Sequence, residues 1–207
     1  MINQEEFIEN LRSGNQAAFS LLIDDYQQKV FNTCISFVPN KEDAEDIAQE
    51  VFLEVYKSIG KFKGNSKLST WIYKICTNKC LEFIRKKNAK KRLVFIQRIL
   101  GNEIPLDKTN FFTEFNHPGI LLEHKERSET IYLAINTLPE SQKTVFTLAK
   151  LDGKTYQEIV EITGKSMSSV ESIMFRAKKN LQKKLLKKLH MILFQKMEFK
   201  QNYLILN

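Results

Sequence analysis

The sequence predicts an all-α protein of two small helical domains joined by a flexible linker. Only 4 prolines and 7 glycines occur among its 207 residues, and apolar residues recur at helical spacing over long stretches. Residues 93–125 break that spacing with Gly101, Pro105 and Pro118. So long an irregular segment belongs between domains rather than inside one. We therefore expect domains at 1–92 and 126–190, a linker at 93–125 and a C-terminal extension at 191–207.

The first domain is expected to hold four helices. Asn15 is a side chain that can cap a helix start, and the pair Pro39-Asn40 ends the helix that follows it. Acidic residues open the third helix, as the helix dipole favours, and Gly60 ends it. The predicted helices cover residues 3–12, 15–38, 41–59 and 68–87.

The second domain carries the pattern of a helix-turn-helix. Pro139 stands at a helix start and Gly153 at a helix end, and Thr155 with Glu158 forms a capping-box pattern. A helix of about eight residues then meets a turn at Gly164, and a second helix follows a serine cap at Ser166 or Ser168. The linker before it contains Phe111, Phe112 and Phe115, which suggest that it docks on another surface.

The second helix of that motif would lie in the major groove of DNA with its N-terminal residues at the base edges. Arginine can reach guanine, glutamate can accept from cytosine, and phenylalanine can touch a thymine methyl group. The lysines farther along would contact phosphates. An αα-hairpin packed inside the protein is the alternative, but the helix is more basic than a buried helix should be. The predicted base- and phosphate-contacting residues are Ser168, Ser169, Glu171, Ser172, Phe175, Arg176 and Lys179.

Charge is distributed unevenly, although the formal net charge is only +8. Residues 1–56 hold 3 basic and 11 acidic side chains, whereas residues 57–92 hold 12 basic and 1 acidic. An acidic block beside a basic block predicts two different partners, the basic one facing a polyanion. On the acidic helix, Asp46, Gln49, Glu50 and Glu54 share one face, and Phe52 is expected to face elsewhere. That face suits a basic protein partner, and a plain solvated face is the alternative.

Aromatic and basic residues alternate in KFKGNSKLSTWIYKIC, residues 61–76. Aromatic rings stack on unpaired bases and lysines follow the backbone, so the stretch predicts a clamp for single-stranded DNA. The small Gly-Asn-Ser loop can form a pocket for an extruded base. Phe62 and Trp71 have an alternative place in the core, and Trp71 can serve both purposes. The clamp residues are Phe62, Lys63, Gly64, Asn65, Ser66, Lys67, Trp71, Lys74 and Asn78.

Neither a metal site nor a cofactor nor a catalytic site is expected. Cys76 and Cys80 share a helix face, but the three histidines are scattered, so these residues and Cys34 are interpreted as buried thiols. Gly164-Lys165-Ser166 has the end of a phosphate-loop motif, but Ile159 stands where that motif needs glycine. The N-terminus is acidic with no signal-peptide pattern, and no apolar stretch is long enough for a membrane span, which together favour the cytoplasm.

The chain resembles the extracytoplasmic-function sigma factors of the sigma-70 family in three stretches: DAEDIAQEVFLEVY, FKGNSKLSTWIYKICTNKCLEFIRKK and LPESQKTVFTLAKLDGKTYQEIVEITGKSMSSVESIMFRAKKNL. The likeness covers about residues 5–92 and 126–188. It implies a sigma region 2-like domain that docks on core RNA polymerase and opens the −10 element of the promoter. It implies a region 4-like domain that reads the −35 element, and a linker that threads toward the polymerase active site. The docking residues by this likeness are Asp43, Asp46, Gln49, Glu50 and Phe52.

The resemblance also implies an anti-sigma factor as a partner, besides core polymerase and promoter DNA, and a monomeric free protein without a small-molecule substrate. The family often has basic residues where Glu171 and Ile173 stand, and the tail after residue 190 runs beyond the usual end. Leu181, Leu185 and Leu189 share a face opposite several lysines, so the tail extends the last helix or lies on a membrane surface. A helix-turn-helix regulator that does not bind core polymerase is the competing function, but it leaves the acidic helix and the aromatic loop unexplained.

Overall fold

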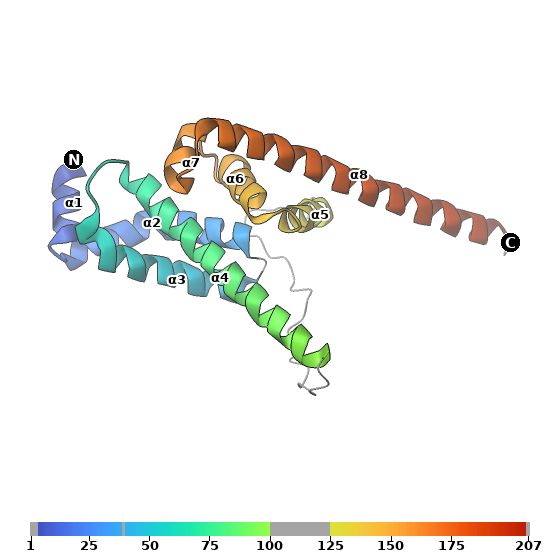
Figure 1. Ribbon diagram of the computed structural model, residues 1–207, viewed down its shortest axis with the longest axis horizontal. Helices are drawn as coiled ribbons and strands as arrows, with labels where there is room; N and C mark the ends of the chain where they lie inside the picture. Colours follow the sequence, from blue (N-terminus) through green and yellow to red (C-terminus); the bar gives the residue numbers. More distant parts are fainter. Residues whose placement is uncertain (1–3, 39, 100–124, 206–207) are drawn as a thin grey trace.

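The computed structural model describes residues 4–38, 40–99 and 125–205, and the side chains of 5–38, 40–94 and 131–187. All regular secondary structure in the described part is helical, with short loops between the helices (Figure 1). The elements are α1 (Gln4–Arg12), α2 (Gln16–Phe37), α3 (Lys41–Ser58), a 3-10 turn η1 (Ile59–Lys61), α4 (Leu68–Ile99), α5 (Lys125–Asn136), α6 (Glu140–Lys150), α7 (Tyr156–Thr163) and α8 (Met167–Ile205).

Local capping side chains set several helix starts where the sequence predicts them. Asn15 accepts from the backbone N–H of Ala18 at 3.1 Å, and Asn40 accepts from that of Asp43. Both bonds satisfy N–H groups that the first helical turn leaves without a partner. The predicted capping box of Thr155 and Glu158 is present at the start of α7. Ser166 is the residue that caps α8, because its Oγ accepts from the N–H of Ser169 at 3.3 Å.

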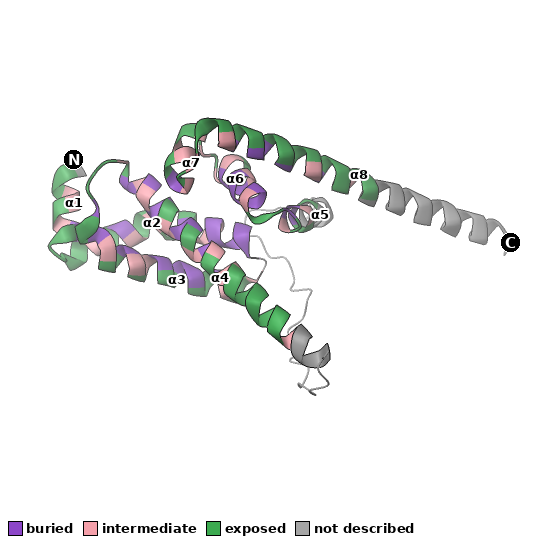
Figure 2. Ribbon diagram, in the orientation of Figure 1, coloured by how far each residue is buried: buried purple, intermediate pink, exposed green. Residues whose placement is uncertain are grey.

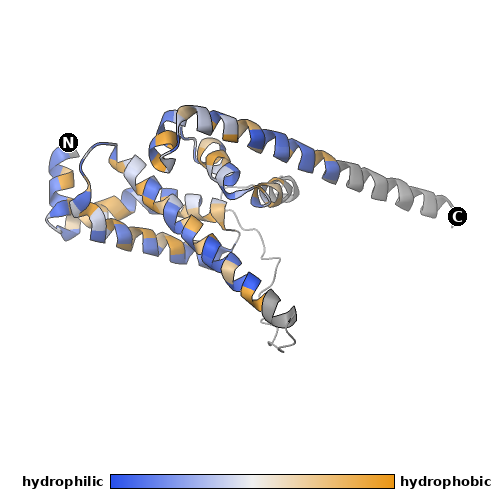
Figure 3. Ribbon diagram, viewed as in Figure 1, coloured by the Kyte–Doolittle hydropathy of each residue, from blue (hydrophilic) through white to orange (hydrophobic). Residues whose placement is uncertain are grey.

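We call α1–α4 the first unit. Helices α2, α3 and α4 pack against one another around buried residues such as Leu22, Ile47, Val51 and Ile72. Figure 2 shows the buried residues of α3 on the side that faces its neighbours, and Figure 3 shows hydrophobic residues on that side. Burying this apolar face supplies most of the stability of these helices, as in other amphipathic helices.

We call α5–α8 the second unit. Its core is formed by side chains of α6, α7 and α8, including Leu148, Ile159, Val170 and Met174. Gly164 ends α7 at φ 68°, in the left-handed region that glycine adopts without steric cost. The short α7, the turn at Gly164 and the start of α8 form the predicted helix-turn-helix.

The two units pack on each other, with α7 against α4 and α6 against α2 (Figure 1). The Nζ of Lys143 in α6 donates to the carbonyl oxygen of Phe37 at 2.6 Å. The hydroxyl of Tyr132 in α5 donates to the carbonyl oxygen of Ile35. Arg85 pairs with Glu140 at 3.0 Å between Nε and Oε2 on the surface. Tyr73 of α4 belongs to the core of the second unit, so the interface is partly apolar.

Two helices are longer than the sequence predicts. Helix α4 continues from residue 87 to Ile99 and crosses the expected boundary at residues 92/93, because no glycine or proline interrupts it before Gly101. Helix α8 continues to Ile205, which confirms that the tail extends the last helix. The linker phenylalanines Phe111, Phe112 and Phe115 lie outside the described residues. None of the helices described could span a membrane.

Candidate docking groove and nucleic-acid interfaces

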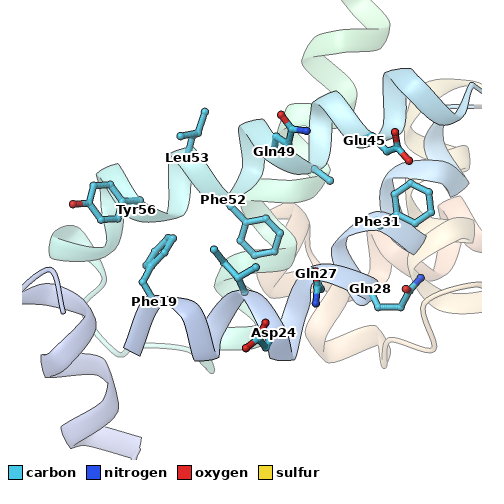
Figure 4. A pocket seen from close by; sticks show the side chains of 12 residues that line it. Phe19, Asp24, Gln27, Gln28, Phe31, Glu45, Gln49, Phe52, Leu53 and Tyr56 are labelled. Carbon is cyan, nitrogen blue, oxygen red and sulfur yellow. The ribbon is translucent and has the colours of Figure 1, made fainter. Parts of the chain in front are cut away.

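A groove of about 740 Å³ runs between α2 and α3 on the outside of the first unit. Figure 4 shows aromatic side chains between the two helices, with carboxylates and amides along the edges. Phe19 and Tyr56 meet edge to face at one end, with ring centroids 5.1 Å apart. The lining residues are Phe19, Ile23, Asp24, Gln27, Gln28, Phe31, Glu45, Ala48, Gln49, Phe52, Leu53 and Tyr56.

Leu53 and Tyr56 beside this groove are more than half exposed. Large apolar side chains exposed together at the edge of a hydrophobic groove mark a surface for a protein partner. The acidic and amide groups around them are Asp24, Glu45 and Gln49, which suits a partner with basic and apolar side chains.

The structure divides the five predicted docking residues into three groups. Gln49 and Phe52 line the groove, whereas Asp46 and Glu50 are exposed on α3 without lining it. Asp43 forms an ion pair with Lys87 of α4, with 2.6 Å between Oδ2 and Nζ. Phe52 stands one turn from Gln49 on the same wall, so these two residues share a side of α3. The other members of the predicted polar face, Asp46, Glu50 and Glu54, do not line the groove, which agrees with the expectation that Phe52 faces away from them.

The α2 wall of the groove is absent from the sequence prediction. Its apolar residues include Phe19, Ile23 and Phe31. Leu22, Val30 and Cys34 are fully buried, whereas Phe19 and Phe31 are only half-buried. The sequence does contain an indication of this second apolar surface. The apolar residues of α2 cover more of its circumference than contact with one core needs.

The loop before α4 presents its polar residues to solvent. Gly64 has a φ of +75°, which glycine adopts freely and which turns the chain tightly. Lys63, Asn65 and Lys67 are exposed, and Ser66 is half-buried. On the first turns of α4, Lys74 and Asn78 are exposed at i and i+4 and therefore share a face with Trp71. These polar and basic residues are thus open to solvent in the loop and along one stripe of α4.

Phe62 differs from this prediction, because only 4% of it is exposed and it packs in the core of the first unit. Its ring lacks an open face for a base, so we correct its assignment as a DNA-contacting residue. Trp71 is half-buried and packs on Phe62, with ring centroids 5.1 Å apart and planes tilted by 43°. Phe62 therefore packs against Trp71 from the core side, and the part of Trp71 that is not buried is open to solvent.

On α8, the predicted reading residues lie on the face away from the core. Val170, Ile173, Met174 and Ala177 are buried, which leaves the positions between them outside. Ser168, Glu171, Ser172, Arg176 and Lys179 are exposed, and Ser169 is half-buried at the helix start.

Phe175 is the most open large apolar side chain described, with 69% exposed. A phenylalanine this open can contact an apolar group of a partner, such as a thymine methyl. Arg176 lies back along its own helix, with Nε donating to the carbonyl oxygen of Ser172 at 3.3 Å. Both side chains can rotate toward a duplex without disturbing the core.

Comparison with known proteins identifies both units. The family model for sigma-70 region 2 matches residues 22–90, and that for sigma-70 region 4 matches residues 128–181. The RNA polymerase sigma-H factor of Pseudomonas aeruginosa is 31% identical over 196 residues, covering 89% of this chain and 96% of that protein. The ECF RNA polymerase sigma-E factor of Escherichia coli is 28% identical over 183 residues, covering 88% and 94%.

Two solved structures share the fold. CnrH in complex with the cytosolic domain of CnrY has a TM-score of 0.63 at 19% identity, covering 88% of this chain and 96% of that one. The sigma factor RpoE of Bartonella quintana, in complex with the anti-sigma factor NepR, has a TM-score of 0.60 at 21% identity, covering 81% and 96%. With both units matched in order, and with a relative above 30% identity over nearly its whole length, the chain belongs to the extracytoplasmic-function sigma factors of the sigma-70 family.

Proposed function

We propose that the protein binds core RNA polymerase through the groove between α2 and α3 and through Asp46 and Glu50 beside it. One observation supports this proposal above all. The first unit has both an acidic, partly apolar groove and a basic loop with Trp71. A regulator that only binds duplex DNA needs neither surface. Polymerase then supplies the chemistry of RNA synthesis, and the sigma factor has no catalytic activity of its own. It acts in the cytoplasm, where polymerase and promoters meet.

The clamp, which we define as Lys63–Lys67 with Trp71, Lys74 and Asn78, holds the melted −10 element in this proposal. Lysines follow the phosphates, and Trp71 offers the stacking surface, worth about 1–3 kcal/mol per base. The exposed face of α8 from Ser168 to Lys179 reads the −35 element in the major groove. This division gives each DNA element its own unit, joined by residues 93–125.

The two units must separate before both elements are bound together. Elements at −35 and −10 are about 25 base pairs apart, which is about 85 Å along B-DNA at roughly 3.4 Å per base pair. In the structure α7, directly before the reading helix, packs on α4, directly after the clamp loop. The described arrangement is therefore the closed form, and promoter binding requires an open one.

An anti-sigma factor is the partner that we propose for the closed form. The two neighbouring structures of CnrH and RpoE were solved with CnrY and with the anti-sigma factor NepR. The groove between α2 and α3 suits a helix with apolar and basic residues. An inhibitor seated there competes directly with polymerase.

The test is gel filtration of the purified full chain with core RNA polymerase in the absence of DNA. We expect co-elution of the wild type and its loss in Asp46→Arg/Glu50→Arg. The matched control is Asp25→Arg/Glu161→Arg, which changes the net charge equally at exposed positions outside the groove. If the wild type does not co-elute, the chain acts as an ordinary DNA-binding regulator. If both variants lose co-elution to the same extent, the docking site is not on α3.

A further inference from the structure

Three thiols from two helices meet in the interior of the first unit. Cys34 of α2, Cys76 and Cys80 of α4 are all fully buried. Their Sγ atoms all lie within 4.8 Å of one another, and those of Cys34 and Cys76 are 3.6 Å apart. The i, i+4 spacing of Cys76 and Cys80 puts them on one face of α4, and α2 brings Cys34 against that face.

This spacing is that of a thiolate metal site. With zinc–sulfur bonds of about 2.3 Å in a tetrahedron, neighbouring sulfur atoms are about 3.8 Å apart. Cys34 and Cys76 already stand near that separation, and a change of side-chain torsion at Cys80 closes the remainder. Thiolates select soft or borderline ions, and zinc is the common one that is not redox-active.

The fourth ligand of such a site has to come from outside the group of three thiols, because their sulfur atoms alone lie together. Asp152 lies in the turn after α6 in the second unit, and its Oδ2 is buried without a hydrogen-bond partner among the described residues. Its carboxylate interacts with Thr33, the neighbour of Cys34 in sequence. A buried carboxylate oxygen without a partner calls for an explanation, and a bound cation supplies one.

Two lysines of the second unit balance the charge of such a site. Lys143 is buried, with Nζ donating to the carbonyl oxygen of Phe37 and to Asn136. Lys154 holds its Nζ 3.5 Å from the centroid of the Tyr73 ring, and it interacts electrostatically with Asp152. A zinc ion with three thiolates and one carboxylate has a net charge of −2, which two ammonium groups neutralise. A buried charged group needs this compensation.

We propose that Cys34, Cys76 and Cys80 bind one Zn²⁺ ion with Asp152 as the fourth ligand, so that the ion ties the second unit to the first. Each thiol releases its proton when the ion binds, so three protons leave for one Zn²⁺. Zinc then favours the closed form and opposes simultaneous binding of both promoter elements. The site stands by itself, whereas its regulatory consequence rests on the proposed function.

The first test is cobalt and zinc binding by the reduced, chelator-treated full chain. We expect one Co²⁺ per chain, with thiolate-to-cobalt charge-transfer absorption and the d–d bands of a tetrahedral site, and displacement by Zn²⁺. Cys80→Ala should weaken the charge-transfer band and the affinity for cobalt, because one of three thiolates is lost. Asp152→Asn should weaken zinc binding by at least on the order of 10-fold, the lower end of what changes next to metal sites cost. Glu161→Gln, at an exposed acid in α7 outside the groove, is the matched control and should bind as the wild type does.

Each outcome decides one part of the proposal. A helical wild-type protein, with three titratable thiols and no charge-transfer band, would overturn the site. A band of unchanged intensity in Cys80→Ala, at unchanged cobalt affinity, would assign the ion elsewhere. If Asp152→Asn binds zinc with unchanged affinity, the bridge between the units is wrong.

The second test is small-angle scattering of the protein alone, with and without zinc. The proposal requires a smaller radius of gyration with zinc in the wild type and no change in Asp152→Asn. An unchanged radius in the wild type would overturn the tie between the units. Neither test uses polymerase or DNA, so failure here is distinct from failure of the docking experiment.

Discussion

Phe62 and Phe175 are both aromatic residues in polar stretches of sequence, and the structure gives them opposite environments. Phe62 is 4% exposed beneath Trp71, while Phe175 is 69% exposed on α8. The helix period separates Phe175 from the buried Ile173 and Met174, so its position could be predicted from the sequence. Phe62 precedes α4 in a loop without a period, so only its contact with the distant core decides its burial.

Arg176 is the only arginine on the reading helix, and its replacement tests how the −35 element is read. Arg176→Ala should weaken binding of the full chain to a −35 duplex by about 1–3 kcal/mol, the usual contribution of an arginine at a base edge. Stability should change by less than about 0.5 kcal/mol, because the side chain is on the surface. Fluorescence anisotropy with a labelled duplex measures the first quantity and urea unfolding the second.

Lys150→Ala is the control for this experiment, since it removes one exposed positive charge outside the reading helix. Equal DNA affinity of Arg176→Ala and wild type would contradict the assignment of α8 as the reading helix.

Helix starts and stops at the element scale follow local chemistry, and most of them could be predicted. Asn15, the Thr155–Glu158 box and Gly164 act within a few residues of themselves, so their roles are visible in sequence. The groove could be predicted only in part. Its α3 wall carries a recognisable acidic pattern, but its α2 wall depends on how two helices pack. The end of α4 was placed too early, because basic residues are good helix formers even without an apolar face.

The capping box gives a test with a defined pH dependence. Hydrogen bonds from Thr155, the backbone N–H foremost, lower the pKa of Glu158 below its ordinary value of 4.5. A carboxylate with a lowered folded-state pKa stabilises the protein above its unfolded pKa, and that contribution is lost as pH falls. Glu158→Gln should therefore cost about 0.5–1 kcal/mol at pH 7. Urea unfolding at pH 7 and below pH 4 should show that Glu158→Gln lowers the free energy of unfolding less in acid. An equal effect at both pH values would contradict a role of the Glu158 charge.

At the scale of the whole molecule, the sequence indicates two units and a linker but says nothing of how the units meet. The interface consists of pairs far apart in the chain, such as Lys143 with Phe37 and Arg85 with Glu140. The sequence around each of these residues does not indicate which residue it will contact. The thiol cluster escaped prediction for the same reason, since Cys34 joins the other two only when α2 packs on α4.

Lys143 makes the interface sensitive to alkaline pH. Burial lowers its pKa from 10.5 to about 8, so the folded protein holds fewer protons than the unfolded chain between these values. The unfolding free energy should therefore rise through that window, and the cost of burying the charge is largest below pH 8. From pH 7 to 9.5 the wild type should gain about 2 kcal/mol relative to Lys143→Met. Urea unfolding of both proteins measures this difference, and parallel pH profiles would contradict it.

Helix α4 carries two sets of residues on opposite sides. Trp71, Lys74 and Asn78 follow one stripe, and Tyr73, Cys76 and Cys80 follow the other at the same spacing. Substitutions in the two stripes should give different phenotypes in a genetic screen. Substitutions in the stripe of Trp71, Lys74 and Asn78 should reduce expression from every promoter of the factor. Mild substitutions in the stripe of Tyr73, Cys76 and Cys80 should raise expression under conditions in which the closed form keeps it low. A selection for constitutive activity would then return substitutions in the second stripe, and one helix would hold both the loss-of-function and the gain-of-function alleles.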